Sequence, residues 1–138
     1  MPLDPHALDA PIAEFRRYTL RPGARDTLIE LFERELLLPQ EASGMRILAQ
    51  FRDLDHPDTF TWMRAFPSAA VRKPALEAFY LGPVWARHRE AANATMLDSD
   101  DVRLLRPVPP SIGLGVDGER SATGAPTGRL VVATVYTL

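Results

Sequence analysis

The sequence contains no cysteine, which excludes disulfide bridges, thiolate metal ligands and a cysteine nucleophile. It also lacks any apolar run near the roughly 20 residues that a membrane-spanning helix needs. The formal net charge is −2, so no excess of positive charge would gather phosphates, and we expect no nucleic-acid partner. The opening stretch MPLDPHALDAP carries two aspartates and no long apolar core, unlike a secretory signal. We therefore expect a cytoplasmic protein that does not contact membranes.

Familiar catalytic motifs are missing as well. The sequence has no G-x-S-x-G, no phosphate loop, no dinucleotide fingerprint and no Glu-x-x-His pattern. Covalent catalysis therefore has no support in the sequence. Of the three histidines, His6 falls in a predicted tail and His56 in a predicted turn, so we expect no metal site. We also expect no tightly bound organic cofactor.

What is present is a clear alternation of hydrophobic periods over 138 residues, enough for one domain with a substantial core. The changes of period predict the order β-α-β-β-α-β. The predicted strands and helices, in order, are Ile12–Leu20, Ala24–Leu38, Met45–Leu54, Thr59–Phe66, a helical region from Ser68 to Leu97, and Asp101–Pro107. Proline is expected to end or bend the first helix at Pro39. Pro74 and the pair Gly82-Pro83 are expected to break the second region.

Two strand-helix-strand units joined by a hairpin predict a ferredoxin-like α+β fold. Its four-stranded antiparallel sheet would have the first and third strands in the middle and both helical regions on one face. The other face would carry Tyr18, Trp62 and Phe66 or their neighbours, which is too apolar for contact with water. A second sheet would cover that face, so we predict a homodimer.

Composition divides the chain into four parts. Residues 1–11 are a tail, residues 12–108 the folded domain, residues 109–128 a Pro/Gly-rich arm, and residues 129–138 a strand-forming run. The run ends with Tyr136-Thr137-Leu138, the triplet that also ends the first predicted strand. We predict that this run adds to a sheet edge, more readily the partner's than its own, or begins a repeat.

Three polar residues alternate on the first strand, namely Glu14, Arg16 and Tyr18, so their side chains share one face. Polar groups on a buried face must pair or line a cavity. One interpretation is a ligand-binding cluster in which Tyr18 donates a hydrogen bond and moves a proton. The alternative is an ion pair of Glu14 with Arg16 or Arg64 at a dimer interface.

Trp62, Arg64 and Phe66 alternate on the third strand in the same way. The two rings could stack on a planar apolar ligand, and the guanidinium could steady a developing oxyanion. Trp85, on the second helical region, is a further candidate ligand contact. Core packing is the alternative for these aromatic residues, and we favour it for Trp85.

His88 is the leading candidate for proton transfer, because it lies three residues after Trp85 on a helix expected to face a pocket. It could act as a general acid or base, or ligate a haem. The alternative is a surface histidine between two arginines.

Several stretches together resemble the NIPSNAP family of the dimeric α+β barrel superfamily. They are EFRRYTLRPG, LIELFERELL, FTWMRAFPS, GPVWARHREAANATM and VRLLRPV, and the resemblance covers about residues 12 to 108. It implies a homodimer whose sheets face each other, with pockets lined by sheet and helices. The superfamily includes cofactor-independent monooxygenases, haem-degrading enzymes, cyclases, isomerases and proteins that only bind.

Three functions remain open at this point. The first is a small-molecule enzyme (oxygenase, cyclase or isomerase) that acts on an apolar or polyketide-like substrate by acid/base chemistry. The second is a non-catalytic homodimer that binds a ligand or a protein, and the third is a haem-binding protein. Whether His88 faces a cavity would discriminate between the first two.

Overall fold

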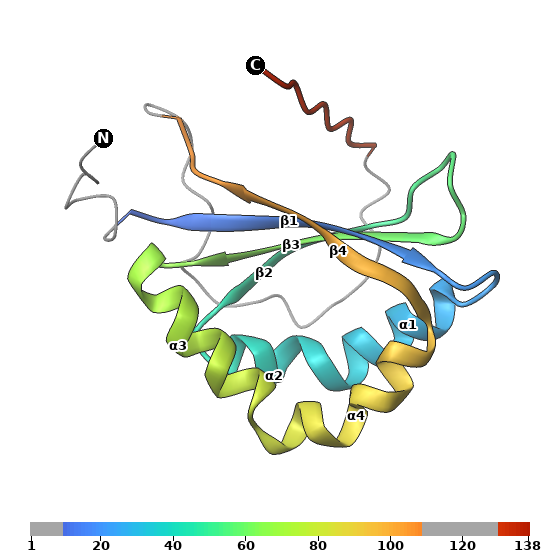
Figure 1. Ribbon diagram of the computed structural model, residues 1–138, viewed down its shortest axis with the longest axis horizontal. Helices are drawn as coiled ribbons and strands as arrows, with labels where there is room; N and C mark the ends of the chain where they lie inside the picture. The colour runs from blue at the N-terminus through green and yellow to red at the C-terminus, as the bar shows by residue number, and fades with distance from the viewer. Residues whose placement is uncertain (1–9, 109–129) are drawn as a thin grey trace.

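The computed structural model of the chain describes residues 10–108 and 130–138 (Figure 1). The predicted tail falls almost entirely outside these ranges, and the Pro/Gly-rich arm falls wholly outside them. The elements, in chain order, are β1 (Ile12–Leu20), α1 (Arg25–Leu31), the π-helix η2 (Phe32–Leu36), α2 (Leu37–Ala42), β2 (Arg46–Phe51), β3 (Thr59–Phe66), α3 (Ala69–Tyr80), α4 (Pro83–Ala94) and β4 (Met96–Leu105).

The four strands form one antiparallel sheet in the order β2-β3-β1-β4, which confirms the ferredoxin-like fold and the central position of β1 and β3. The hairpin of β2 and β3 is confirmed too. Figure 1 shows all the helices on one side of the sheet and no helix on the opposite side, which we call the bare face. A turn at Pro22-Gly23 connects β1 to α1. Gly23 has a φ of 77°, which glycine adopts more easily than other residues.

The sequence predicts that Pro39 ends or bends the first helical region; the region does not end there and continues through three segments to Ala42. In a regular α-helix the ring of Pro39 would clash with the carbonyl of Glu35, four residues earlier. Glu35 lies in the π-helix η2, where Leu37 donates its backbone N–H to Phe32, five residues back. This wider turn accommodates the proline without ending the helix.

Pro74 does not break the second region either, because α3 runs through it from Ala69 to Tyr80. Ser68 caps α3, because its hydroxyl accepts from the Val71 N–H at 3.3 Å. The break falls at Gly82, where a Cβ would lie 2.8 Å from the Ala78 carbonyl oxygen. Only glycine fits this tight join, and Pro83 then starts α4 at a favoured position.

The boundary between α4 and β4 lies earlier than predicted. The helix ends at Ala94 and the strand begins at Met96, not at Asp101. The stretch Met96–Asp100 is too polar to look like a strand. It pairs nonetheless with the end of β1, through two shifts of register, and forms an exposed sheet edge.

The core lies between the sheet and the helices. Tyr18, Trp62 and Phe66 are all buried there, so it is their neighbours that occupy the bare face. Strand alternation and register place Phe15 of β1 opposite Met63 of β3 on that face. Phe51 of β2 is on the same face, beside Thr61. The bare face therefore has an apolar centre.

The C-terminal residues 130–138 form no strand within the described chain, and the four-stranded sheet does not include them. Their large apolar side chains are exposed, from Leu130 to Leu138. Pairing with the chain's own sheet is therefore not seen, and pairing with a partner's sheet stays a prediction.

Candidate functional site: a buried arginine network beside an aromatic cavity

The register of the central strands brings the predicted polar residues together. β1 and β3 align Glu14 with Arg64, Arg16 with Trp62, and Tyr18 with Phe60. All of these side chains lie on the face that the helices cover. Because they face the helices, the ion pairs they form belong to the interior of one chain and not to the bare face of the sheet.

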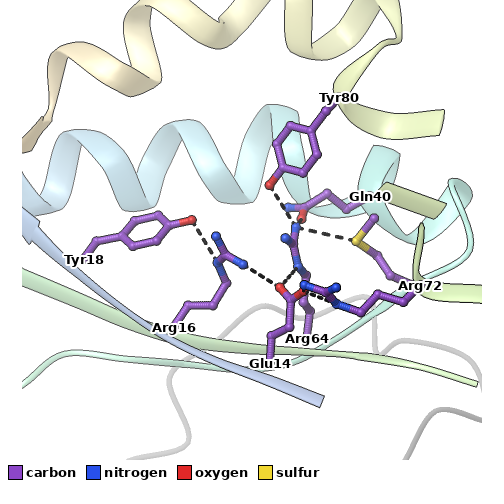
Figure 2. A network of polar contacts seen from close by, with 8 residues as sticks. Glu14, Arg16, Tyr18, Gln40, Arg64, Arg72 and Tyr80 are labelled. Carbon is purple, nitrogen blue, oxygen red and sulfur yellow. Dashed lines mark hydrogen bonds and ion pairs between the residues drawn. The ribbon is translucent and has the colours of Figure 1, made fainter. Parts of the chain in front are cut away.

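Glu14 is fully buried and binds three arginines (Figure 2). Its Oε1 accepts hydrogen bonds from Arg64 Nε at 2.7 Å and from an Arg16 guanidinium nitrogen at 2.5 Å. Its Oε2 accepts from Arg72 Nε at 2.8 Å. Burial by itself would raise the pKa of the Glu14 carboxyl, but the charges and hydrogen bonds of Arg64 and Arg16 outweigh it and hold that pKa below its ordinary value. Glu14 is therefore ionised and fully engaged near neutral pH.

Arg64 reaches from the sheet to the helices. One of its guanidinium nitrogens donates to Gln40 Oε1 at 2.8 Å and to the Tyr80 hydroxyl at 3.0 Å. The guanidinium also lies 5.1 Å from the Trp62 ring centroid, within cation–π range. These contacts and the bond to Glu14 compensate the burial of the Arg64 charge, which is almost inaccessible to solvent.

Arg16 binds the Tyr18 hydroxyl much as Arg64 binds the Tyr80 hydroxyl. Its Nε donates to the Tyr18 hydroxyl at 3.1 Å, and its guanidinium lies 5.5 Å from the Trp62 ring centroid. Burial raises the pKa of the Tyr18 phenol, although Arg16 acts in the opposite sense. The phenol therefore keeps its proton near neutral pH and can donate it in a hydrogen bond.

Beside this network the sheet and the helices enclose a cavity of about 30 Å³, room for about two water molecules. With the open space at its mouth, the empty volume is about 330 Å³. Its apolar lining consists of Leu28, Phe32, Leu36, Phe60, Phe79 and Met96. The lining side chains with polar atoms are Tyr18, Gln40, Trp62, Tyr80 and Trp85. Phe32 and Leu36 come from the π-helix η2, a kind of segment that often occurs at functional sites.

The structure thus brings together most of the predicted site residues. Tyr18, Trp62 and Trp85 line the cavity, while Glu14, Arg16 and Arg64 stand behind it. Phe66 is buried but does not line the cavity; it lies under the Arg72 guanidinium at 5.9 Å. Trp85 also packs edge-on against Tyr80, with centroids 5.2 Å apart.

His88 stands apart from this group. Its Nε2 lies 3.4 Å from Glu35 Oε2 on η2, its side chain is largely buried, and it is not among the residues that line the cavity. Its predicted role in proton transfer stays a prediction.

Three polar residues of the site were not predicted from the sequence. They are Gln40, Arg72 and Tyr80, and all three come from helices. For Gln40 the sequence did contain a signal, because it follows Leu36 by four residues and so continues the buried stripe of the first helical region. A polar residue at a core position indicates a buried hydrogen-bond partner.

No three His, Asp or Glu side chains gather closely enough to hold a metal ion anywhere in residues 10–108 or 130–138. In the same part of the chain, none of the helices has both the length and the apolar character needed to cross a bilayer.

The sheet topology and the helices on one face define a ferredoxin-like α+β protein. One solved structure with this fold is a putative antibiotic biosynthesis monooxygenase from Chloroflexus aurantiacus J-10-fl. It is 19% identical to this chain with a TM-score of 0.55, and the match covers 77% of this chain and 100% of that one.

The family itself follows from the sequence. The NIPSNAP family model matches residues 13–111, and the chain belongs to that family. A NIPSNAP-like domain protein from Burkholderia xenovorans is 20% identical with a TM-score of 0.71, covering 80% of this chain and 97% of that one. A NIPSNAP family protein from Agrobacterium tumefaciens C58 is 20% identical with a TM-score of 0.66. The match covers 74% of this chain and 90% of that one. At these identities the likeness concerns the fold alone. The search of curated proteins returns no match.

Proposed function

We propose that the protein is a homodimeric small-molecule enzyme that acts by acid/base chemistry without a tightly bound organic cofactor. Its site is the aromatic cavity between sheet and helices, and its substrate is small and largely apolar. The observation that carries this proposal is that Arg16 holds the Tyr18 hydroxyl and Arg64 holds the Tyr80 hydroxyl, both at the cavity wall. Buried, preorganised donors of this kind stabilise charge that develops on a substrate.

In this mechanism Tyr18 donates to the oxygen of the substrate on which negative charge develops. If the phenol proton moves to that oxygen, Arg16 stabilises the tyrosinate that remains, because its Nε already bonds the phenol oxygen. Arg64 plays the same part behind Tyr80. Oxygenase, cyclase and isomerase reactions that pass through an enolate develop negative charge on an oxygen, and this geometry supports reactions of that kind.

Acid/base catalysis also requires a group that accepts a proton. Glu14 lies behind the cavity donors, and three arginines hold it. His88 remains the candidate general acid or base, and a histidine in that role contributes about 100- to 10,000-fold to turnover. Turnover that is unchanged in His88→Ala would assign proton transfer to another group.

The second candidate is a non-catalytic homodimer that binds a ligand. The observation that favours it is the engagement of Glu14, which leaves the cavity wall with hydrogen-bond donors and without a free carboxylate base among the described residues. The haem alternative lacks a candidate ligand at this cavity, since His88 does not line it.

The homodimer is part of the proposal, as is the cytoplasmic location. What supports the dimer is the apolar centre of the bare sheet face, with Phe15, Met63 and Phe51. Membership of the NIPSNAP family, whose resemblance implies a homodimer, supports it as well. A second sheet packed on this face would remove these side chains from water.

A titration by ¹H–¹⁵N NMR tests the site. The sequence has two tryptophans, Trp62 and Trp85, and both line the cavity, so their two indole N–H signals report on it directly. We expect members of a set of small aromatic and alicyclic molecules to shift both signals. Mass spectrometry of the same mixtures then separates catalysis, which changes the mass of a compound, from binding alone. If no compound shifts either signal, the cavity is not a ligand site.

A further inference from the structure

Helix α4 forms part of the cavity wall but is lightly anchored to the rest of the chain. Of its twelve residues, only Ala92 is fully buried. Val84 and Trp85 are partly buried against the core, and Trp85 is the residue of α4 that lines the cavity. Because α4 removes few apolar side chains from water, displacing it costs less than displacing a helix of the core.

One polar contact holds the middle of α4. His88 Nε2 lies 3.4 Å from Glu35 Oε2 on the π-helix η2. The other oxygen of the same carboxylate accepts from Arg34 Nε at 3.2 Å. No other side chain of α4 forms a hydrogen bond or an ion pair with a residue that the structure describes. The contact between His88 and Glu35 is therefore the polar side-chain link between α4 and η2.

This contact connects two walls of the cavity. Trp85 precedes His88 by three residues on α4, and Phe32 precedes Glu35 by three residues on η2. Both Trp85 and Phe32 line the cavity. Since residues three apart on a helix are neighbours on its surface, the contact fixes how far Trp85 stands from the η2 wall.

The cavity is too small for an organic ligand while α4 stays in this position. Its volume of about 30 Å³ admits about two water molecules, whereas a cavity that holds benzene measures about 150 Å³. Binding of even a small ring therefore requires a wall to move. The sheet is fixed by strand pairing, and the first helical region buries Leu28, Phe32 and Leu36. The wall that moves at least cost is therefore α4.

We propose that α4 is the movable wall of the cavity, and that His88 and Glu35 are positioning residues that hold it, with Trp85, in the closed position. Opening of α4 makes room for a ligand, and re-formation of the contact brings Trp85 against that ligand. This role needs no proton transfer by His88. It rests on the proposed ligand site and adds the route by which a ligand enters.

Methyl relaxation dispersion on the ligand-free, full-length protein tests the movement. Opening of a wall of this kind occurs in microseconds to milliseconds, the range that the method detects. We expect exchange at the methyl groups of Leu28 and Leu36, which line the cavity. Leu20 is the internal control, because it is buried in the core but does not line the cavity.

Alanine variants assign the closed position to the contact. Glu35→Ala and His88→Ala should each raise the open population by about two- to fivefold, as expected for a partly exposed pair. The double variant should gain no more than the larger single effect, because both changes remove the same contact. Glu77→Ala is the matched control, since Glu77 pairs with Lys73 on the exposed surface of α3 and should leave the exchange unchanged.

A crosslink then stops the movement. The sequence has no cysteine, so His88→Cys with Glu35→Cys creates one pair of thiols, which bis-maleimidoethane can join between α4 and η2. The same reagent on Lys73→Cys with Glu77→Cys, one turn apart on α3, is the matched control. The first crosslink should suppress the exchange at the cavity methyl groups. It should also weaken binding of benzene, followed by the two indole N–H signals, at least about tenfold. The control crosslink should change neither.

Each outcome decides a different point. If the cavity methyl groups show no more exchange than Leu20, or if the α4 crosslink leaves their exchange unchanged, the inference is overturned. Equal binding of benzene with and without that crosslink also overturns it, and the cavity then stands as a ligand site with a fixed wall. Additive effects of the two alanine substitutions would overturn the role assigned to their contact. If the crosslink suppresses the exchange but benzene shifts neither indole signal of the unaltered protein, the movable wall is supported and the proposed ligand site loses its support.

Discussion

Arg64 Nε lies 2.7 Å from Glu14 Oε1, across the two central strands, and both side chains are almost inaccessible to solvent. The pair joins β1 to β3, and further bonds of Arg64 join β3 to α2 and α3. The same guanidinium thus holds the sheet to the helices and fixes two polar groups of the cavity wall. Stability and site geometry depend on one interaction.

The first prediction concerns this pair. Glu14→Gln should lower the free energy of unfolding by about 3–5 kcal/mol, because it leaves the buried Arg64 charge without its counter-ion. Glu30→Gln is the matched control, since Glu30 pairs with Arg34 on an exposed helix surface and such pairs contribute little. Urea unfolding measures both variants. Equal losses in the two would show that the buried pair does not stabilise the fold.

The second prediction is that acid lowers the free energy of unfolding through protonation of the Glu14 carboxylate. The pKa of Glu14 is below its ordinary value in the folded chain, so in acid the unfolded chain takes up the proton first. The stabilisation is therefore complete above the ordinary glutamate pKa of about 4.3 and is lost as the pH falls through the lower folded value. Urea unfolding from pH 7 down to pH 3 should show this loss. In Glu14→Gln the slope over that range should be smaller, and an identical slope would contradict the assignment.

The third prediction separates the ring of Tyr18 from its hydroxyl. Tyr18→Ala should cost about 3–5 kcal/mol, because the ring is buried edge-on against Phe60 and Trp62. Tyr18→Phe keeps the ring and removes only the acceptor of Arg16, which should cost about 1–2 kcal/mol. Thermal unfolding compares the two. A melting temperature for the Ala variant equal to that of the unaltered protein would show that the ring does not pack in the core.

Much of this site could be predicted from strand periodicity. Alternation placed Glu14, Arg16 and Tyr18 on one face, and the central position predicted for the first and third strands placed Arg64 beside them. Alternation shows which residues share a face of the sheet, but it does not show which face packs against the helices. The sequence therefore left open whether this face or the opposite one is bare.

The helical contributions were harder to predict. Arg72 and Tyr80 reach the network only because α3 crosses the sheet at one particular angle, and no local pattern encodes that angle. Local rules predict an end or a bend at Pro39 and a break at Pro74, and neither proline ends its helix. A π-helical turn accommodates the first, and packing against the sheet keeps α3 intact around the second.

The fourth prediction concerns the dimer. Light scattering at micromolar concentration should give twice the chain mass of 15.4 kDa. Phe15→Glu should shift the protein to monomers, weakening association by at least ~100-fold, because it buries an unpaired charge at the centre of the bare sheet face. Leu81→Glu is the control: Leu81 is exposed at the join of α3 and α4, on the helix side, and should leave the mass unchanged. A stable monomer of the unaltered chain would contradict the dimer.

The last prediction concerns residues 130–138, whose valines and terminal Tyr136-Thr137-Leu138 form a strand-like run that the described chain leaves exposed. Unpaired runs of this composition recruit other chains, so we expect the segment to pair with an edge of the partner's sheet. Deletion of the chain after Pro110 should then weaken the dimer by roughly tenfold or more in sedimentation equilibrium.

A full-length variant provides the matched comparison for that deletion. Val132→Pro combined with Val135→Pro keeps the chain length but removes backbone donors that strand pairing requires, so it should weaken the dimer about as much as the deletion. Replacing the same two valines by threonine retains both the backbone donors and the β-branched shape, so the dimer should persist. If the deletion and the proline variant both dimerise like the unaltered protein, the segment does not pair with the partner, and the alternative that it begins a repeat is favoured.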